Sequence, residues 1–123
     1  MLIFKICHMA EWQAAQPSKV FHGTAKDGED GFLHFSTGMQ IPATLNRHYA
    51  DADNLVLVAV EADRLGRRLK WEPSSNGDLY PHLYSVLSLS DVAWALSITR
   101  KPNGAFALPA QVFATDGTPP VAS

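Results

Sequence analysis

The segment at residues 54–60, Asn-Leu-Val-Leu-Val-Ala-Val, constrains the fold more than any other part of this chain. An unbroken run of aliphatic residues follows the asparagine, and three of them are β-branched valines. Successive side chains of a strand point to opposite faces, so this run places apolar side chains on both faces. We therefore expect a central strand here, covered on both sides.

Alternating patterns and turn residues predict the remaining elements around this strand. Further strands are expected at 2–7, 31–37, 69–72, 79–84, 92–99 and 106–108. A helix is expected at 9–16, and a second one runs from the capping-box pattern Thr37-x-x-Gln40 to about Tyr49. Residues 18–30 are expected to form a polar loop, either a flap or a surface connection. Pro81 favours an edge or bulged position for the strand that contains it. Two early helices followed mostly by strands indicate an α+β fold.

Length and charge limit the class of protein. A chain of 123 residues is long enough for a single core, which we place at 1–109, with a tail at 110–123. The formal net charge of −2 argues against a dedicated nucleic-acid binder. One cysteine, Cys7, excludes an intrachain disulfide and favours a reducing, cytoplasmic location. The apolar start of the chain is too short for a membrane span, so no membrane partner is expected.

Two histidine-centred segments carry the functional signal, Gly31–Thr37 and Leu79–Tyr84. At the strand period of two, Phe32, His34 and Ser36 share one face, and Leu33 and Phe35 share the other. By the same rule one face of the second segment carries Tyr80, His82 and Tyr84. A buried imidazole needs hydrogen-bond partners, so a packed core alone does not account for these stripes. We expect the two strands to line a common cleft.

The residue types in this cleft fit a nucleotide better than the other candidate ligands. Tyrosine and histidine rings stack on bases, while imidazole, Ser36 and Thr37 can hydrogen-bond ribose hydroxyls, and Lys5 can meet a pyrophosphate. No phosphate-binding glycine loop and no G-x-S-x-G elbow occurs. Metal-binding spacings such as H-x-x-x-H are also missing, so no metal is expected. A metal site would have to be assembled from distant residues: His8, His22, His34, His48, His82, Glu72 and the aspartates.

The order of these motifs resembles a bacterial family of uncharacterised small domains, domain-of-unknown-function family 952. The resemblance covers about residues 3–109, and the two histidine motifs are its most specific parts. It is carried by Trp12-x-x-Ala15, the stretch from Asp27 to Thr37 with Gln40, residues 55–60, Trp71-Glu72, Pro81-His82-Leu83-Tyr84, and Gly104-x-Phe106-x-Leu108-Pro109.

The chain is also distantly similar to RNA 2′-phosphotransferases of the ADP-ribosyltransferase-like superfamily. That resemblance implies a single-domain split β-sheet that clasps NAD, with two short helices in the N-terminal half. Lys5 stands where those enzymes place a basic NAD contact, and His34 matches the residue beside the nicotinamide ribose. The third member of the site would be His82 or Glu72. The stretch Asp30-Gly31-Phe32 replaces their RNA-binding arginine, so the resemblance implies the fold more than the RNA reaction.

The leading hypothesis is a domain that binds NAD or a similar small-molecule nucleotide and transfers or hydrolyses ADP-ribose. His34 would hydrogen-bond the ribose or nicotinamide, Tyr80 or Tyr84 would stack on a ring, and Lys5 would offset pyrophosphate charge. Glu72 would stabilise the developing cation or orient a nucleophile, with His82 as a further catalytic candidate. A non-catalytic binding module and a metal-dependent hydrolase using His34, His82 and Glu72 stay open as alternatives. The acceptor and the oligomeric state are left open.

Overall fold

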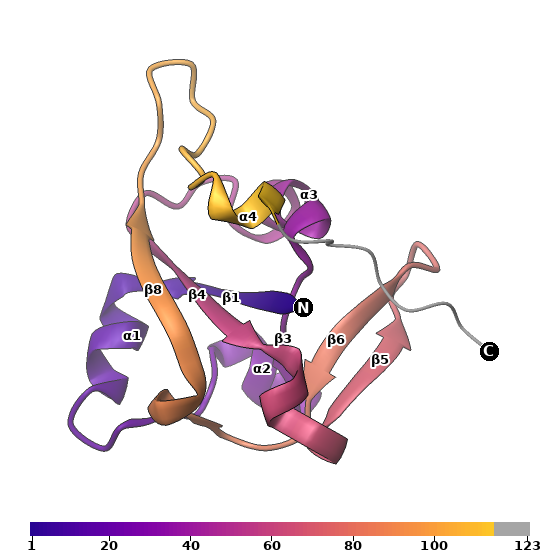
Figure 1. Cartoon of the computed structure of the whole chain (residues 1–123). Helices are drawn as coiled ribbons and strands as arrows, with labels where there is room; N and C mark the ends of the chain where they lie inside the picture. The colour runs from indigo at the N-terminus through magenta and orange to yellow at the C-terminus, as the bar shows by residue number, and fades with distance from the viewer. Residues whose placement is uncertain (115–123) are drawn as a thin grey trace.

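The strand expected at 54–60 lies at the centre of a three-stranded antiparallel sheet (Figure 1). In the computed structural model, which describes residues 1–114, this strand is β4 (Leu55–Glu61). It pairs with β1 (Leu2–His8) on one side and with β8 (Val92–Ile98) on the other. The prediction of a strand buried on both faces is confirmed, because every residue from Leu55 to Val60 is buried.

The two faces of β4 contribute to two separate apolar clusters. Val56, Val58 and Val60 belong to the first cluster. Leu55 and Leu57, together with Ala59, belong to the second. Alternation along one strand therefore divides the core into two layers, one on each face of the sheet.

A second three-stranded sheet carries both histidine segments. Its strands are β3 (Leu33–His34), β6 (Leu79–Leu83) and β5 (Leu69–Pro73), in the order β3-β6-β5. β6 is therefore central, and the edge position expected from Pro81 is wrong. Pro81 is tolerated because it lies just past the end of the two-residue β3, where its carbonyl oxygen accepts a hydrogen bond from the Phe35 N–H. A third, two-stranded sheet pairs β2 (Val20–Phe21) with β7 (Leu87–Ser88).

A backbone bridge joins the first and second sheets. Phe4 of β1 and Ser36, just after β3, exchange two backbone hydrogen bonds of 2.8 Å and form an isolated bridge. Beyond this bridge, no strand within residues 1–114 pairs with the outer edge of β1. The sheets therefore separate from a common contact, as Figure 1 shows for β1 and the β5–β6 hairpin.

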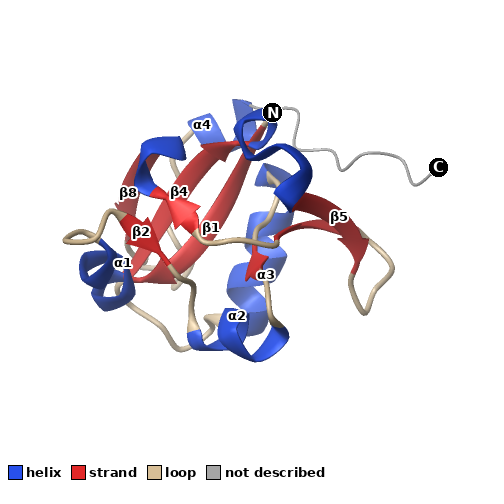
Figure 2. Ribbon diagram, turned by 90° about the horizontal axis from the view of Figure 1, so that it is seen from below, coloured by secondary structure: helices blue, strands red, loops and turns tan. Residues whose placement is uncertain are grey.

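Three α-helices lie in the first half of the chain, one more than expected. They are α1 (Met9–Ala15), α2 (Ala25–Asp30) and α3 (Ile41–His48), and Figure 2 shows α2 and α3 on the side of the second sheet. The expected Thr37–Gln40 box opens the 3₁₀ helix η1 (Gly38–Gln40), which leads into α3. Two other 3₁₀ segments connect strands, η2 (Ala62–Arg68) and η3 (Leu89–Asp91). No helix within residues 1–114 is long and apolar enough to cross a membrane.

The prediction of a polar loop at 18–30 is wrong, because this stretch contains β2 and α2. Local capping accounts for the helix despite its polar composition. The Thr24 hydroxyl accepts a hydrogen bond from the Asp27 backbone N–H, and the Asp27 carboxylate accepts one from the Thr24 N–H. Gly31 ends the helix in the left-handed conformation at φ 83°, which glycine adopts without steric cost.

The C-terminal region also differs from expectation. Phe106 forms only an isolated bridge with Arg100 in place of a strand at 106–108. The expected tail begins with α4 (Gln111–Ala114), whose Val112 is buried in the second cluster. The rest of that tail, 115–123, lies outside the described residues. The α+β class with antiparallel sheets is confirmed, and the ADP-ribosyltransferase-like form of the split sheet stays a prediction.

Val112 provides a test of whether α4 belongs to the folded domain. Its side chain is 1% exposed, whereas the neighbouring Phe113 is 56% exposed. We expect Val112→Ala to lower the free energy of unfolding by about 1 to 2 kcal/mol through lost apolar burial. The matched control Phe113→Ala should change it by about 0.5 kcal/mol or less. Equal urea-denaturation midpoints for Val112→Ala and the wild type would contradict the packing of α4.

Candidate functional site

A cavity of about 640 Å³ lies along the unpaired edge of β1, where the two larger sheets separate. Strands β1, β3 and β6 and helices α2 and α3 contribute its wall. The wall residues used below are Lys5, His8, Glu11, Lys26, Asp27, Asp30, Phe32, His34, Ser36, Arg47, His48, Tyr49, Tyr80 and His82. The common cleft expected for the two histidine segments is therefore present.

His34 and His82 are direct cross-strand partners in the β3–β6 pair. Their ring centroids lie 5.5 Å apart in an edge-on arrangement. The Phe32 ring stacks on His82 at 4.1 Å and lies 4.5 Å from His34. Phe32, His34 and Ser36 all line the cavity, while Leu33 and Phe35 are buried in the first cluster, and Phe35 also forms part of the cavity wall. The predicted assignment of side chains to strand faces agrees with this geometry.

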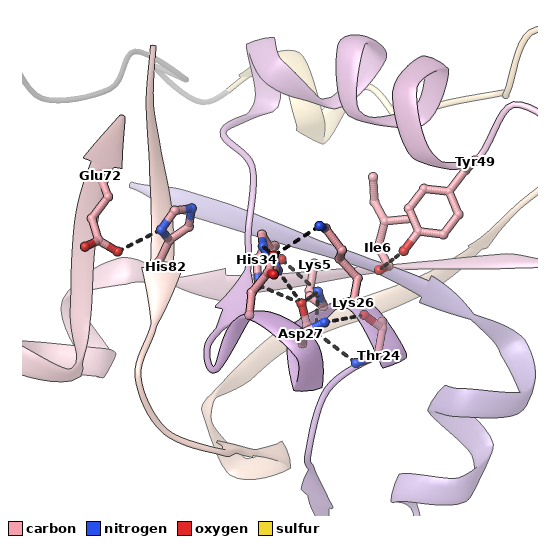
Figure 3. Close-up of polar contacts among 10 residues, drawn as sticks. Lys5, Ile6, Thr24, Lys26, Asp27, His34, Tyr49, Glu72 and His82 are labelled. Carbon is pink, nitrogen blue, oxygen red and sulfur yellow. Dashed lines mark hydrogen bonds and ion pairs between the residues drawn. The ribbon is translucent and has the colours of Figure 1, made fainter. Parts of the chain in front are cut away.

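The Asp27 carboxylate is the buried centre of the site (Figure 3). Its Oδ1 accepts hydrogen bonds from the His34 backbone N–H at 3.0 Å and from His34 Nδ1 at 2.6 Å. Lys5 Nζ lies 2.6 Å from Oδ2 and 2.9 Å from Oδ1. Lys5 also donates to the carbonyl oxygen of His34 at 2.9 Å. One carboxylate thereby connects β1, α2 and β3.

These donors keep Asp27 ionised inside the protein. Burial alone would raise the pKa of Asp27, but the hydrogen bond from His34 and the positive charge of Lys5 hold it well below its usual range. Burial lowers the pKa of the Lys5 ammonium, and Asp27 opposes that shift. Each charge stays in the interior because the other is adjacent to it.

The second ring nitrogen of His34 faces a second carboxylate. Its Nε2 lies 2.9 Å from Oδ2 of Asp30, which also pairs with Lys26 at 3.3 Å. Asp30 lies on the exposed side of α2, in contrast to the buried Asp27. His34 is therefore held on one side by a fixed buried partner and on the other by a solvent-accessible one.

His82 has a different environment, with one carboxylate at one nitrogen. Its Nδ1 lies 2.8 Å from Oε1 of Glu72, and the Tyr84 hydroxyl donates to the same oxygen at 2.6 Å. Burial lowers the pKa of His82, and the hydrogen bond to Glu72 partly opposes this shift. A neutral His82 that donates Nδ1–H to Glu72 keeps a lone pair on Nε2. This ring is thus arranged to accept a proton or a hydrogen bond.

The structure brings only some of the predicted site residues to the cavity. His34, His82, Ser36, Tyr80 and Lys5 line it, although Lys5 is only 3% exposed. Three others do not: Thr37 is fully buried, Glu72 pairs with His82, and Tyr84 donates a hydrogen bond to Glu72.

Sequence reasoning missed the roles of Asp27, Asp30 and Phe32. The pattern Thr24-x-x-Asp27 carries the signal of a helix start that would have placed Asp27. The strand period places Phe32 on the correct face, but it does not show that the Phe32 ring contacts both histidines. The contact of Asp27 with Lys5 joins residues 22 positions apart, and no local pattern reports such a pair.

Metal binding and nucleophilic chemistry at Cys7 gain no geometric support. Within residues 1–114, no three His, Cys, Asp or Glu side chains come together to hold a metal ion. Cys7 is fully buried in the first cluster, and burial raises its pKa to about 12. A thiol in this state is a core side chain rather than a nucleophile.

The charge of Asp27 can be tested through the pH dependence of the free energy of unfolding. Asp27→Asn leaves Lys5 without its counter-ion, so we expect a loss of about 3 to 5 kcal/mol in the free energy of unfolding at pH 7. Because the folded pKa of Asp27 is depressed, its contribution is complete above the ordinary value of 3.8 and is lost progressively as the pH falls from there through the folded pKa. The stability gap between variant and wild type should therefore narrow steadily in acid.

Urea denaturation between pH 7 and pH 2 measures this gap. The double variant Lys5→Met with Asp27→Leu serves as the control, since removing both charges should recover much of the loss. A gap that is constant over the whole pH range would contradict the charged pair.

The comparisons with known proteins agree with the fold and leave the chemistry open. No curated protein matches the sequence. The crystal structure of protein CC0527 from Caulobacter crescentus is 41% identical, covering 92% of this chain and 99% of that one, with a TM-score of 0.86. The solution structure of CC0527 is 44% identical over 84% of this chain and 89% of that one, with a TM-score of 0.76. The model of the family "Protein of unknown function (DUF952)" matches residues 6–95, so the chain belongs to this family.

Proposed function

We propose that the cavity binds NAD or another ADP-ribose-containing nucleotide, and that the histidine pair acts on its ribose to transfer or hydrolyse ADP-ribose. The observation that carries this proposal is the pairing of His34 and His82 on one cavity wall, each oriented by a carboxylate. Histidine pairs held in this way are typical of acid–base and hydroxyl-binding sites.

The size and lining of the cavity support a nucleotide ligand. Small-molecule sites commonly measure roughly 300 to 1,000 Å³ and combine aromatic walls with a few polar groups. The wall here offers Phe32, Tyr49 and Tyr80 as ring surfaces, and Ser36 as a hydroxyl. The Ser36 hydroxyl already pairs with that of Thr44 at 2.8 Å, so a sugar hydroxyl would join an existing hydrogen-bond pair.

His82 is the proposed general base. In the reaction, the bond from ribose C1′ to the nicotinamide nitrogen breaks, and its electron pair neutralises the pyridinium. Water or an acceptor hydroxyl forms the new bond to C1′ and gives its proton to Nε2 of His82. Glu72 does not line the cavity, so it acts through His82 as a positioning residue, with Tyr84 on the same oxygen.

His34 is the proposed ribose ligand. With Nδ1 fixed on Asp27, its Nε2 faces Asp30, whose carboxylate is exposed. A ribose hydroxyl replaces Asp30 at Nε2, while Tyr80 stacks on the nicotinamide. Asp27 then has a positioning role, because it sets the ring orientation and the nitrogen that remains for the ligand.

A second candidate function is a non-catalytic module that binds the same class of ligand. One observation favours it: both ring nitrogens of His34 already have carboxylate partners within the protein. Binding without release of nicotinamide distinguishes this module from an enzyme.

Ligand binding gives the first test of the proposed function. NAD or ADP-ribose at a hundredfold its Kd should stabilise the wild type by about 2.7 kcal/mol in thermal unfolding. His34→Ala should weaken binding about tenfold or more through the loss of its hydrogen bond to the ribose, whereas His82→Ala should mainly reduce the release of nicotinamide. His22→Ala is the matched control, since His22 is exposed and not on the cavity wall. A folded His34→Ala variant with wild-type affinity would refute the proposed site.

The acid limb of turnover gives the second test. Only neutral His82 accepts a proton, and its pKa lies below the ordinary 6.5, so nicotinamide release should fall with acid below that pH. Glu72 raises the pKa of His82, and Glu72→Gln should therefore shift the acid limb to lower pH and reduce the plateau rate. Glu29→Gln, at an exposed α2 position, is the control. An unshifted limb in Glu72→Gln would rule out this role for Glu72.

A further inference from the structure

We infer that Arg47 and His48 of α3, with Lys26 of α2, form a phosphate-binding subsite in the cavity. The subsite would hold the pyrophosphate of the bound nucleotide, so this inference rests on the proposed function. It assigns phosphate recognition mainly to α3. The sequence had indicated Lys5 for this role.

Lys5 is a poor candidate because its charge is already matched. Its Nζ contacts both oxygens of Asp27 and the His34 carbonyl, and its side chain is 4% exposed. A phosphate that used Lys5 would have to enter this buried ion pair and compete with Asp27 for the ammonium. Breaking such a buried pair leaves an uncompensated charge in the interior, which is strongly unfavourable.

Arg47 differs from the other cations of the cavity wall. Lys5 pairs with Asp27, and Lys26 pairs with Asp30. Of the lysines and arginines that line the cavity within residues 1–114, only Arg47 has no ion-pair partner. The remaining wall carboxylate, Glu11, accepts a hydrogen bond from the His8 backbone at 2.7 Å. The guanidinium is therefore available to an anion.

The three side chains line the same cavity from two helices. Residues Ala43, Thr44, Arg47 and His48 line the wall at the spacing of one helical face. Lys26 comes from α2 on the other side, and in Figure 3 it lies between His34 and Tyr49. An anion here would lie next to the His34 region that is proposed to hold the ribose.

Several cationic groups act on His48. Burial lowers the pKa of His48, and the positive charges of Arg47, Lys26, His34 and Lys5 lower it further. These groups come from its own helix and from α2, β3 and β1, and two of them, Lys5 and Lys26, also pair with carboxylates. A phosphate group would relieve this repulsion, and arginine provides the paired N–H donors that phosphate oxygens accept.

Calorimetric titrations of wild type, Arg47→Ala and Lys26→Ala test the subsite with ADP-ribose and with phosphate-free nicotinamide riboside. We expect Arg47→Ala to weaken ADP-ribose binding about tenfold or more and to leave nicotinamide riboside binding unchanged. Lys26→Ala should have a smaller effect of the same kind, because Lys26 also pairs with Asp30. Arg67→Ala, at an exposed position of η2 outside the cavity, is the control. Arg47→Gln provides a second variant with less change in volume.

The outcomes separate this subsite from the proposed function. If wild type binds ADP-ribose and both Arg47 variants bind it equally well, the subsite is overturned and the nucleotide function stands. Equal losses in Arg47→Ala and Arg67→Ala also overturn the subsite, since the effect is then one of net charge. Binding of inorganic pyrophosphate that requires Arg47, without binding of NAD or ADP-ribose, supports the subsite and overturns the proposed function. No binding of any of these ligands overturns both.

Discussion

The site depends on the hydrogen bonds and the ion pair that the buried Asp27 carboxylate makes. This carboxylate is buried, yet it accepts hydrogen bonds from a lysine of β1, from a backbone amide and an imidazole of β3, and from the start of its own helix. An unpaired carboxylate at this depth would be strongly unfavourable, so these partners must assemble together. The orientation of His34 follows from the same requirement that ties the two sheets and α2 together.

The cavity follows from where the sheets stop pairing. Phe4 and Ser36 close a single bridge, after which β1 keeps an unpaired edge. Helices α2 and α3 both contribute to the wall of the cavity there, so their side chains rather than a further strand line it. Unpaired backbone at a sheet edge is commonly covered or charged in soluble proteins. In this protein that edge is part of the wall of the candidate site.

The parts of this architecture that sequence patterns predicted are those set by local periodicity. The two-sided burial of 55–60 and the shared face of Phe32, His34 and Ser36 follow directly from the strand period. Helix α2 was missed because its composition, with Gly28 and three acids, is that of a loop, and only its caps favour a helix. The partners of Lys5 and His82 depend on strand order and register. Those are tertiary properties, which is why Glu72 was assigned to the cavity and Asp27 was given no role.

The two histidines share a register position but differ in electrostatics, and the roles proposed for them follow from this difference. His34 has a carboxylate near each ring nitrogen, so each nitrogen faces a hydrogen-bond acceptor. His82 has one carboxylate, is more buried, and has a lowered pKa, which favours a neutral ring with a free lone pair. The proposed function uses this difference, with His34 as the ligand of a sugar hydroxyl and His82 as the group that deprotonates a nucleophile. An interchange of the roles would require His82 to lose Glu72 or His34 to lose Asp27, and each of those carboxylates is held by a further donor, Tyr84 or Lys5.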